Sequence, residues 1–155
     1  MVLREVEQDD LQVFFQHQLD STANRMAAFT AEDPADLATF LARWSRFLTD
    51  ETIVKRTIII DSHVVGHIMS FVQDGDTEVT YWIDRAYWGR GIASQALAEF
   101  LTQVTTRPVH ARVAKDNIGS QKVLQRCGFV IVGEDSGFAH GRGEVVEEFV
   151  LQLTA

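Results

Sequence analysis

The chain has 155 residues, 46 % of them hydrophobic, and a formal net charge of −8 with a pI near 5.0. This length suits one domain over residues 1–155 that buries most of its unfolded surface. The acidic balance argues against nucleic-acid binding, because such proteins need cations that neutralise phosphates. Short, interrupted apolar runs exclude a membrane span, and a single cysteine with no leader pattern predicts a cytoplasmic protein.

The first third of the chain predicts a strand and two helices. Residues 2–6 read as a strand, and Asp9 or Asp10 is expected to cap the amphipathic helix that follows. Asp33 and Pro34 are typical of the cap and first turn of a second helix. The apolar stripe of this second helix comprises Leu37, Phe40, Leu41, Trp44 and Leu48.

The middle of the chain predicts three neighbouring strands. Thr57–Asp61 and His63–Val72 are rich in β-branched residues, and Gly66 inside the second run predicts a bulge or a close backbone contact. The Asp74-Gly75 pair is a hairpin signal. It joins the second run to an alternating strand over Glu78–Asp84.

A glycine-rich turn follows that strand and opens a helix. Glycines let the backbone turn sharply and approach a ligand, and the free N–H groups of a helix N-terminus attract anions. Arg90 adds a full positive charge to this turn. Strand-to-helix turns also use glycine for geometry alone, so a phosphate cradle and a plain turn are both compatible with the pattern. The turn is Trp88-Gly89-Arg90-Gly91-Ile92-Ala93-Ser94, and the apolar positions of the helix are Ile92, Leu97, Phe100, Leu101 and Val104.

Charge is unevenly distributed along the sequence. Residues 85–126 hold seven Lys or Arg against two acidic residues, a net charge of +5, whereas the rest of the chain carries −13. The glycine-rich turn therefore lies in the only basic segment, which favours anion binding. A Walker phosphate loop is excluded because Gly-Lys-Ser/Thr is absent, and a Rossmann fingerprint because only Gly89 and Gly91 of its glycines are present.

Three further runs complete the expected sheet. Val109–Val113, Phe129–Val132 and Val145–Leu153 are rich in apolar or alternating residues, as strands are. With the helices between them, the pattern predicts an α/β (α+β) fold. We expect a mixed, mostly antiparallel sheet of about seven strands flanked by helices.

Two segments together resemble the GNAT superfamily of N-acetyltransferases. The family writes its acetyl-CoA pyrophosphate loop as Q/R-x-x-G-x-G/A, which aligns with Trp88-Gly89-Arg90-Gly91-Ile92-Ala93. At the usual distance further along, it has an Asn, a short helix and a strand-opening Gly-Phe pair, matched by Asn117 and Gly128-Phe129. The loop opening and the Asn117-x-x-Ser120 element look most like the branch of ribosomal-protein N-terminal acetyltransferases. The resemblance is good over residues 57–132 and implies the acyl-CoA N-acyltransferase fold.

This resemblance implies an enzyme that moves the acetyl group of acetyl-CoA by direct attack of a primary amine on the thioester, without a metal. Backbone groups near Trp82 and Ile83 would polarise the thioester carbonyl. Trp88 stands where the family has Gln or Arg, so Arg90 is expected to compensate. The cofactor-binding residues implied are Trp82, Ile83, Trp88, Gly89, Arg90, Gly91, Ile92, Ala93, Ser94, Asn117, Ser120 and Lys122.

Glu78 and Ser120 are the expected catalytic residues. Strand alternation puts Glu78 on one face with Thr80 and Trp82, and the family often has a catalytic glutamate on this strand; an exposed strand-end charge is the alternative. As a base, Glu78 would need a raised pKa or a water relay. The tyrosine with which many members protonate the leaving thiolate falls at Leu124. Ser120, one turn earlier on the same helix face, is the nearest hydroxyl, with a cofactor contact or a helix cap as its other roles.

The family uses the segment between the first two helices, here residues 17–30, to face the acceptor. The expected substrate-binding residues are therefore Asn24, Met26 and Phe29. The acidic remainder of the chain favours a cationic acceptor, either a small-molecule amine such as a polyamine or aminoglycoside, or a peptide N-terminus. An exposed edge of the C-terminal strand would support a homodimer. The alternative to an enzyme is a non-catalytic acyl-CoA-binding sensor or interaction domain, which the missing tyrosine would permit.

Overall fold

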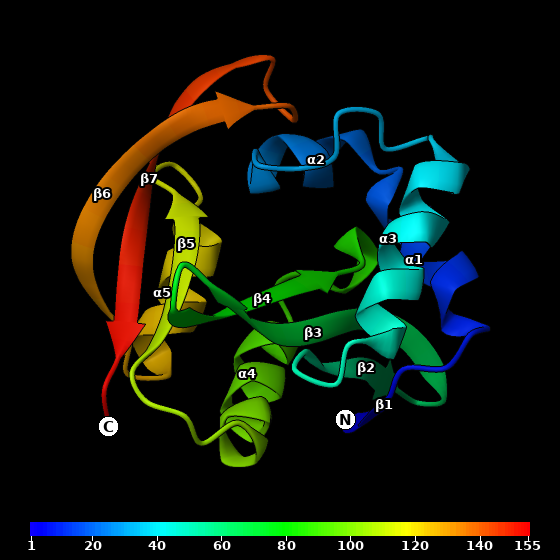
Figure 1. Ribbon diagram of the computed structural model, residues 1–155, viewed down its shortest axis with the longest axis horizontal. Helices are drawn as coiled ribbons and strands as arrows, with labels where there is room; N and C mark the ends of the chain where they lie inside the picture. Colours follow the sequence, from blue (N-terminus) through cyan, green and yellow to red (C-terminus); the bar gives the residue numbers. More distant parts are fainter.

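Seven strands form one mixed sheet in the computed structural model, which describes residues 1–155. In chain order they are β1 (Val2–Glu5), β2 (Val54–Ile60), β3 (His63–Gln73), β4 (Asp76–Ile83), β5 (Val109–Ala114), β6 (Val130–Ala139) and β7 (Glu144–Leu153). Their order across the sheet is β1-β2-β3-β4-β5-β7-β6, and only β4 and β5 run parallel. The predicted mixed, mostly antiparallel sheet of seven strands is confirmed (Figure 1).

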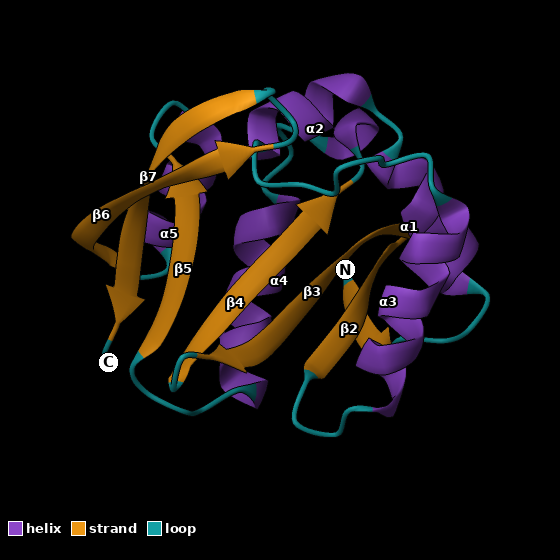
Figure 2. Ribbon diagram, turned by 45° about the horizontal axis from the view of Figure 1, so that its top comes forward, coloured by secondary structure: helices purple, strands orange, loops and turns teal.

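Helices cover both faces of the sheet. They are α1 (Asp10–Gln18), α2 (Ser21–Ala27), α3 (Leu37–Thr49), α4 (Ile92–Gln103) and α5 (Ile118–Arg126), with a short 3-10 helix, η1 (Arg85–Tyr87), before α4. Figure 2 shows α4 and α5 on one face and α1 and α3 on the other, so the sheet is the middle of three layers. None of these helices combines the length and the hydropathy needed to cross a membrane.

Neighbouring residues of β3 belong to the two larger clusters of the core, because strand side chains alternate between faces. Ile68 packs with Phe100 of α4 in the larger cluster, and neither side chain is exposed. Met69 points to the other face and packs with Phe14 of α1 and Trp44 of α3. The predicted apolar stripe of α4 is therefore its core-facing side, and burial of Phe100 alone stabilises the fold by about 2 kcal/mol.

The N-terminal segment holds one helix more than the sequence predicts. α2 lies between the first two expected helices, in a segment that the sequence predicted to be a loop. The Asp20 carboxylate accepts the Ala23 N–H at 2.8 Å and so caps α2. This helix has only seven residues, too few for an apolar periodicity to be recognised.

The next helix begins later than its sequence signal. α3 starts at Leu37, and the carboxylate of Asp36 caps it by accepting the Thr39 N–H at 3.1 Å. The expected cap, Asp33, accepts the Ala35 N–H in the turn that precedes the helix. Two aspartates within four residues offer the same local signal, and only the structure decides which one caps the helix.

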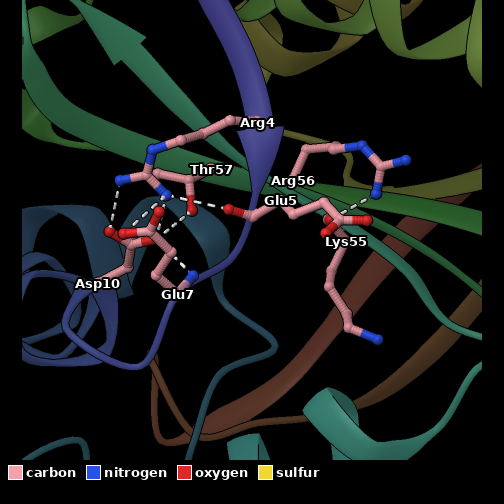
Figure 3. Close-up of polar contacts among 7 residues, drawn as sticks. All are labelled: Arg4, Glu5, Glu7, Asp10, Lys55, Arg56 and Thr57. Atoms are coloured by element: carbon pink, nitrogen blue, oxygen red, sulfur yellow. Dashed lines mark hydrogen bonds and ion pairs between the residues drawn. The ribbon is translucent and has the colours of Figure 1, made fainter.

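A buried carboxylate joins α1 to the sheet, where the sequence predicted only a cap. Asp9, at the cap position, makes no side-chain capping bond. Asp10 is 3 % exposed and accepts from both terminal nitrogens of Arg4 at 2.7 and 2.8 Å, from the Glu7 N–H at 2.8 Å and from the Thr57 hydroxyl at 2.7 Å (Figure 3). Burial raises the pKa of Asp10, but the bond to Arg4 and the other two bonds outweigh it and hold the pKa below its usual range.

The C-terminal strand lies inside the sheet. β7 pairs with β5 on one side and with β6 on the other, so the prediction that it offers an exposed edge is wrong. The free edge on that side belongs to β6, which runs over ten residues where the sequence predicted four. The turn at 140–143 returns the chain as a hairpin, and pairing with β7 extends β6 beyond its apolar start.

Candidate active site

The two parallel strands at the centre of the sheet separate soon after they meet. β4 and β5 pair only at Thr77↔Val109 and Glu78↔His110. Beyond these pairs the strands diverge, as Figure 2 shows, while β3 continues to pair with β4 on its other side. We call the diverging segments, β4 after Glu78 and β5 after His110, the fork.

Backbone donors of β4 face into the fork. Asp84 donates its N–H to the Val65 carbonyl of β3 at 2.8 Å, and backbone direction alternates along an antiparallel strand. The N–H groups of Tyr81 and Ile83 therefore point away from β3, toward β5. The same alternation turns the backbone groups of Trp82 to β3, so of the two expected oxyanion donors only Ile83 faces the fork.

The glycine-rich turn lies at the C-terminal end of β4, where the fork is widest. Gly89 and Gly91 have φ of 78° and 75°, a left-handed conformation that favours glycine, and Gly91 caps α4. A Cβ at either position would meet no atom within 4 Å, so the backbone of this turn borders open space. The expected contacts Ile92, Ala93 and Ser94 form the first turn of α4, whose N–H groups have no partner within the helix.

Trp88 and Arg90 have different roles in this turn. The Trp88 indole N–H donates to the Ile83 carbonyl at 2.9 Å, so Trp88 fixes the turn to the end of β4. Arg90 stacks its guanidinium 5.0 Å from the centre of the Tyr87 ring and forms no ion pair with a carboxylate. The only cation of the turn is therefore exposed and available to an anion.

α5 brings a hydroxyl to the fork, and β4 brings a second one. The Ser120 hydroxyl lies 2.6 Å from the Tyr81 hydroxyl. Burial raises the pKa of Tyr81 to about 12, although the hydrogen bond to Ser120 opposes this. Leu124 is 1 % exposed and belongs to the core, as its side chain requires. A tyrosine hydroxyl of β4 thus contacts the serine of α5 that lies one helical turn before Leu124.

The other two expected residues of α5 differ in their surroundings. The side-chain oxygen of Asn117 accepts the Ser120 N–H at 3.2 Å, and its amide nitrogen donates to the Met26 carbonyl at 3.4 Å. Asn117 thus caps α5 and ties it to α2. Lys122 is exposed and forms no hydrogen bond or ion pair within the protein.

Glu78 lies at the closed end of the fork and is buried, so it is not the exposed strand-end charge that was the alternative. Its side chain is 9 % exposed, and its carboxylate lies 3.4 Å from Nε of Arg112 on β5. Arg112 also pairs with Glu148 at 2.8 Å and with Asp135 at 3.2 Å, so it is shared among three carboxylates. Burial raises the pKa of Glu78 above its usual value, and Arg112 opposes the shift without reversing it.

A pocket of about 430 Å³ lies beside β4 on the face covered by α1 and α3. We call it the aromatic pocket, because six aromatic rings are among its lining side chains: Phe29, Phe40, Trp44, Phe47, Phe71 and Trp82. Two of the three expected substrate-binding residues, Asn24 and Phe29, line it, whereas Met26 does not. The Asn24 amide donates to the carbonyls of Gln18 and Asp20, so it also holds the start of α2.

One histidine lines the aromatic pocket. His67 of β3 packs against the rings of Phe14 and Trp44, with centroids 4.7 and 5.1 Å away. Burial lowers the pKa of His67 to about 3, so the imidazole is neutral near pH 7. His67 therefore adds no positive charge to the pocket.

The structure gathers most of the predicted residues around the fork. The glycine-rich turn lies at its wide end, Glu78 at its closed end, and Ser120 beside it. Sequence reasoning missed Tyr81, Arg112 and the α3 and β3 side of the pocket. Tyr81 alternates with Val79 like any core residue of a strand, so no local signal marks it.

Comparison with known proteins gives consistent matches. The model of the acetyltransferase (GNAT) domain matches residues 1–130. An uncharacterized N-acetyltransferase, p20, of Bacillus licheniformis is 23 % identical over 163 residues, covering 99 % of this chain and 92 % of the relative.

Two solved structures share the fold over nearly the whole chain. Ribosomal-protein-alanine N-acetyltransferase of Brucella melitensis superposes with a TM-score of 0.82 at 17 % identity, over 100 % of both chains. RimJ of Mycobacterium smegmatis, in complex with CoA-disulfide, gives 0.82 at 22 % identity, over 99 % of this chain and 81 % of its own.

Proposed function

The chain belongs to the acetyltransferase (GNAT) domain family, and we propose that it transfers the acetyl group of acetyl-CoA to a primary amine by direct attack of the amine on the thioester. The observation that carries this proposal is the fork. It joins an anion-attracting helix N-terminus at one end to a buried carboxylate at the other, with free backbone donors between them.

Acetyl-CoA suits this arrangement in its length and in its charges. Its pyrophosphate would bind the turn at Gly89–Gly91 and the N-terminus of α4, with Arg90 as a counter-charge. The pantetheine arm would then run along the open edge of β4, where amide groups pair with strand donors as a further strand would. From Ile83 back to Glu78 the strand advances five residues, roughly 17 Å. An extended arm of this kind brings the thioester toward the closed end of the fork.

The chemistry needs a nucleophile, a base and a stabilised leaving group. The amine nitrogen attacks the thioester carbon, and a backbone N–H of the fork, that of Tyr81 or Ile83, stabilises the oxyanion. The nitrogen loses its proton to Glu78, directly or through one water, because the raised pKa makes this carboxylate a stronger base than an exposed one. The carbon–sulfur bond then breaks, and coenzyme A leaves as a thiolate.

Ser120 and Tyr81 act on this thiolate as hydrogen-bond donors. The 2.6 Å contact between the two hydroxyls allows either to donate. In the proposed mechanism Tyr81 donates to the Ser120 oxygen, which leaves the Ser120 hydroxyl free to donate to sulfur. A thiol titrates near pH 8.5, far below either hydroxyl, so the pair stabilises the departing thiolate without giving up a proton. The leaving group can therefore depart although position 124 is a leucine.

Calorimetric titration of acetyl-CoA tests the donor. We expect saturable binding that is lost in a Gly91→Trp variant, because Trp disfavours φ of 75° and would fill the open space beside the turn. 3′-dephospho-CoA serves as a second ligand that keeps the pyrophosphate. Absence of binding to the folded protein would refute the transferase and the sensor functions together.

Thiol release with amines then separates the two remaining functions. An enzyme releases coenzyme A in proportion to the amine acetylated, whereas an acyl-CoA sensor binds the donor and releases none. We propose the enzyme because Ser120 and Tyr81 supply leaving-group stabilisation that a sensor does not need.

A further inference from the structure

We propose that the acceptor is a small primary amine with an aromatic body and no second positive charge. This substrate class rests on the transferase function proposed above. It goes against the cationic acceptors that the overall charge of the chain favours, because the aromatic pocket differs from the rest of the surface.

Aromatic rings dominate the walls of the pocket. They come from α3, from β3 and β4, and from the segment after α2, so they enclose the pocket from several sides. Three of them pack in a series of tilted and edge-on contacts: Phe40 and Trp44 have centroids 6.3 Å apart, and Trp44 and Phe47 5.3 Å. Phe15, outside the pocket, supports Phe40 from behind at 5.3 Å. Rings held in this way present fixed faces and edges to a ligand ring. A volume of about 430 Å³ suits a small molecule of one or two rings.

The pocket has no net negative charge with which to bind a polycation. Its ionisable side chains are Arg43, Asp50 and His67, and His67 is neutral. The Oδ1 atom of Asp50 accepts the N–H and the hydroxyl of Thr52 at 2.9 and 2.6 Å, and the charge of this one carboxylate is offset by that of Arg43. Arg43 has no ion-pair or hydrogen-bond partner in the protein and repels a second ammonium group. A polyamine or an aminoglycoside would thus bring several cations into a largely apolar pocket whose one carboxylate, Asp50, is balanced by Arg43.

The pocket extends to the immediate neighbours of the proposed base, Glu78. Phe71, one of its rings, lies directly across from Glu78 in the β3–β4 pairing. Thr80 and Trp82, which also line it, share the face of β4 with Glu78 by alternation. An aromatic body in the pocket therefore leaves its amine at the end nearest Glu78.

Apolar surroundings also help the amine to react. Burial disfavours the charged form of an ammonium group and lowers its pKa, which increases the neutral fraction that attacks the thioester. A second ammonium group would lose solvation in the same way and gain nothing for the reaction. The apolar lining therefore selects against polycations and activates monoamines.

The test compares four acceptors in the thiol-release assay: phenethylamine, tryptamine, hexylamine and spermidine. We expect kcat/KM for the two aromatic amines to exceed that for spermidine by roughly tenfold or more. The kcat/KM for hexylamine should lie between the aromatic values and the spermidine value. A spermidine value equal to or above that of phenethylamine, with full turnover, overturns the acceptor class while the transferase function stands. Equal values for hexylamine and phenethylamine overturn the aromatic part of the class.

Binding of phenethylamine to the CoA-saturated protein, measured by calorimetry, tests the pocket without turnover. If phenethylamine binds but is not acetylated, the transferase function is refuted and the preference of the pocket for aromatic amines is supported. If phenethylamine neither binds nor is acetylated, the acceptor class is overturned. A Phe47→Ala variant is expected to raise KM for phenethylamine roughly tenfold with kcat and the acetyl-CoA Kd unchanged. Phe138→Ala, an exposed phenylalanine on β6 outside the pocket, is the matched control and is expected to leave all three values unchanged. Equal KM values of the two variants for phenethylamine overturn the assignment of the aromatic pocket as the acceptor site.

Discussion

Replacing Ser120 by Ala removes the hydroxyl that we assign to the departing sulfur, and the usual strength of a hydrogen bond to a charged group gives the size of the effect. A hydrogen bond to a charged group contributes about 1.5–3 kcal/mol, which corresponds to roughly a 10- to 150-fold change in kcat. Tyr81→Phe leaves the Ser120 hydroxyl in place but removes the partner that orients it at 2.6 Å. We therefore expect a smaller loss, about tenfold or less, from the tyrosine variant.

The double variant decides whether the two hydroxyls act together. If Tyr81 acts only through Ser120, Tyr81→Phe has no further effect on kcat in the Ser120→Ala background. The assay is thiol release at saturating acetyl-CoA and amine, with the acetyl-CoA Kd measured in parallel and Ser136→Ala, an exposed serine on β6, as control. Because the pKa of Tyr81 is about 12, titration of this pair lowers no rate between pH 8 and 10. A kcat for Ser120→Ala within twofold of wild type, or fully additive losses, would refute the assignment.

Three further results are expected. Glu78→Gln lowers kcat roughly 100-fold or more if Glu78 is the base. The activity of the wild type is expected to rise with pH through a pKa above the usual glutamate value. A Glu78→Gln variant whose activity rises with pH in the same way contradicts this role. Asp10→Asn lowers the free energy of unfolding at pH 7 by about 2 kcal/mol, because the charge-assisted hydrogen bonds of this part-buried pair with Arg4 are lost. Because the folded-state pKa of Asp10 is lowered, its contribution to the free energy of unfolding is present above the unfolded pKa near 3.9 and is lost as the pH falls through the folded-state value. Urea titrations should therefore show that the stability difference between wild type and Asp10→Asn shrinks below about pH 4. A difference that does not change with pH argues against the ionised pair. Acetyl-CoA at 100 times its Kd is expected to raise the free energy of unfolding by about 2.7 kcal/mol, as measured by thermal melts. It should also slow amide hydrogen exchange at Tyr81 and Ile83, as measured by NMR. Unchanged exchange at both amides would mean that the cofactor does not lie along β4.

Features that depend on local sequence were predictable. Gly89 and Gly91 predicted both the turn and the start of α4, because glycine adopts φ near 75° without strain. The strands of the central hairpin followed from alternation and from the Asp74-Gly75 turn signal, and the close contact expected at Gly66 is present, since a Cβ there would clash with the Trp82 carbonyl. These signals act over a few residues, and no distant partner alters them.

Features that depend on pairs of distant residues were not predictable. Tyr81 and Ser120 are 39 positions apart in the chain, and Arg112 reaches Glu78 from the neighbouring strand. Whether Glu78 was a buried base or an exposed charge depended on packing that alternation does not reveal. Both aspartates near the start of α3 satisfied the capping rule, and the wrong one was nearer the proline.

The pairing of β5 explains why this sheet can support acyl transfer. β5 shares two residue pairs with β4 and its whole length with β7, so β4 keeps backbone donors free after Glu78 while β3 holds them in position. Donors held in this way need no reorganisation when a carbonyl oxygen becomes negative. The fork thus provides the features of the reaction that do not depend on the acceptor. In our proposal, selectivity comes from pocket side chains of α3, β3 and β4, and these can change while the backbone pairing of the sheet stays the same.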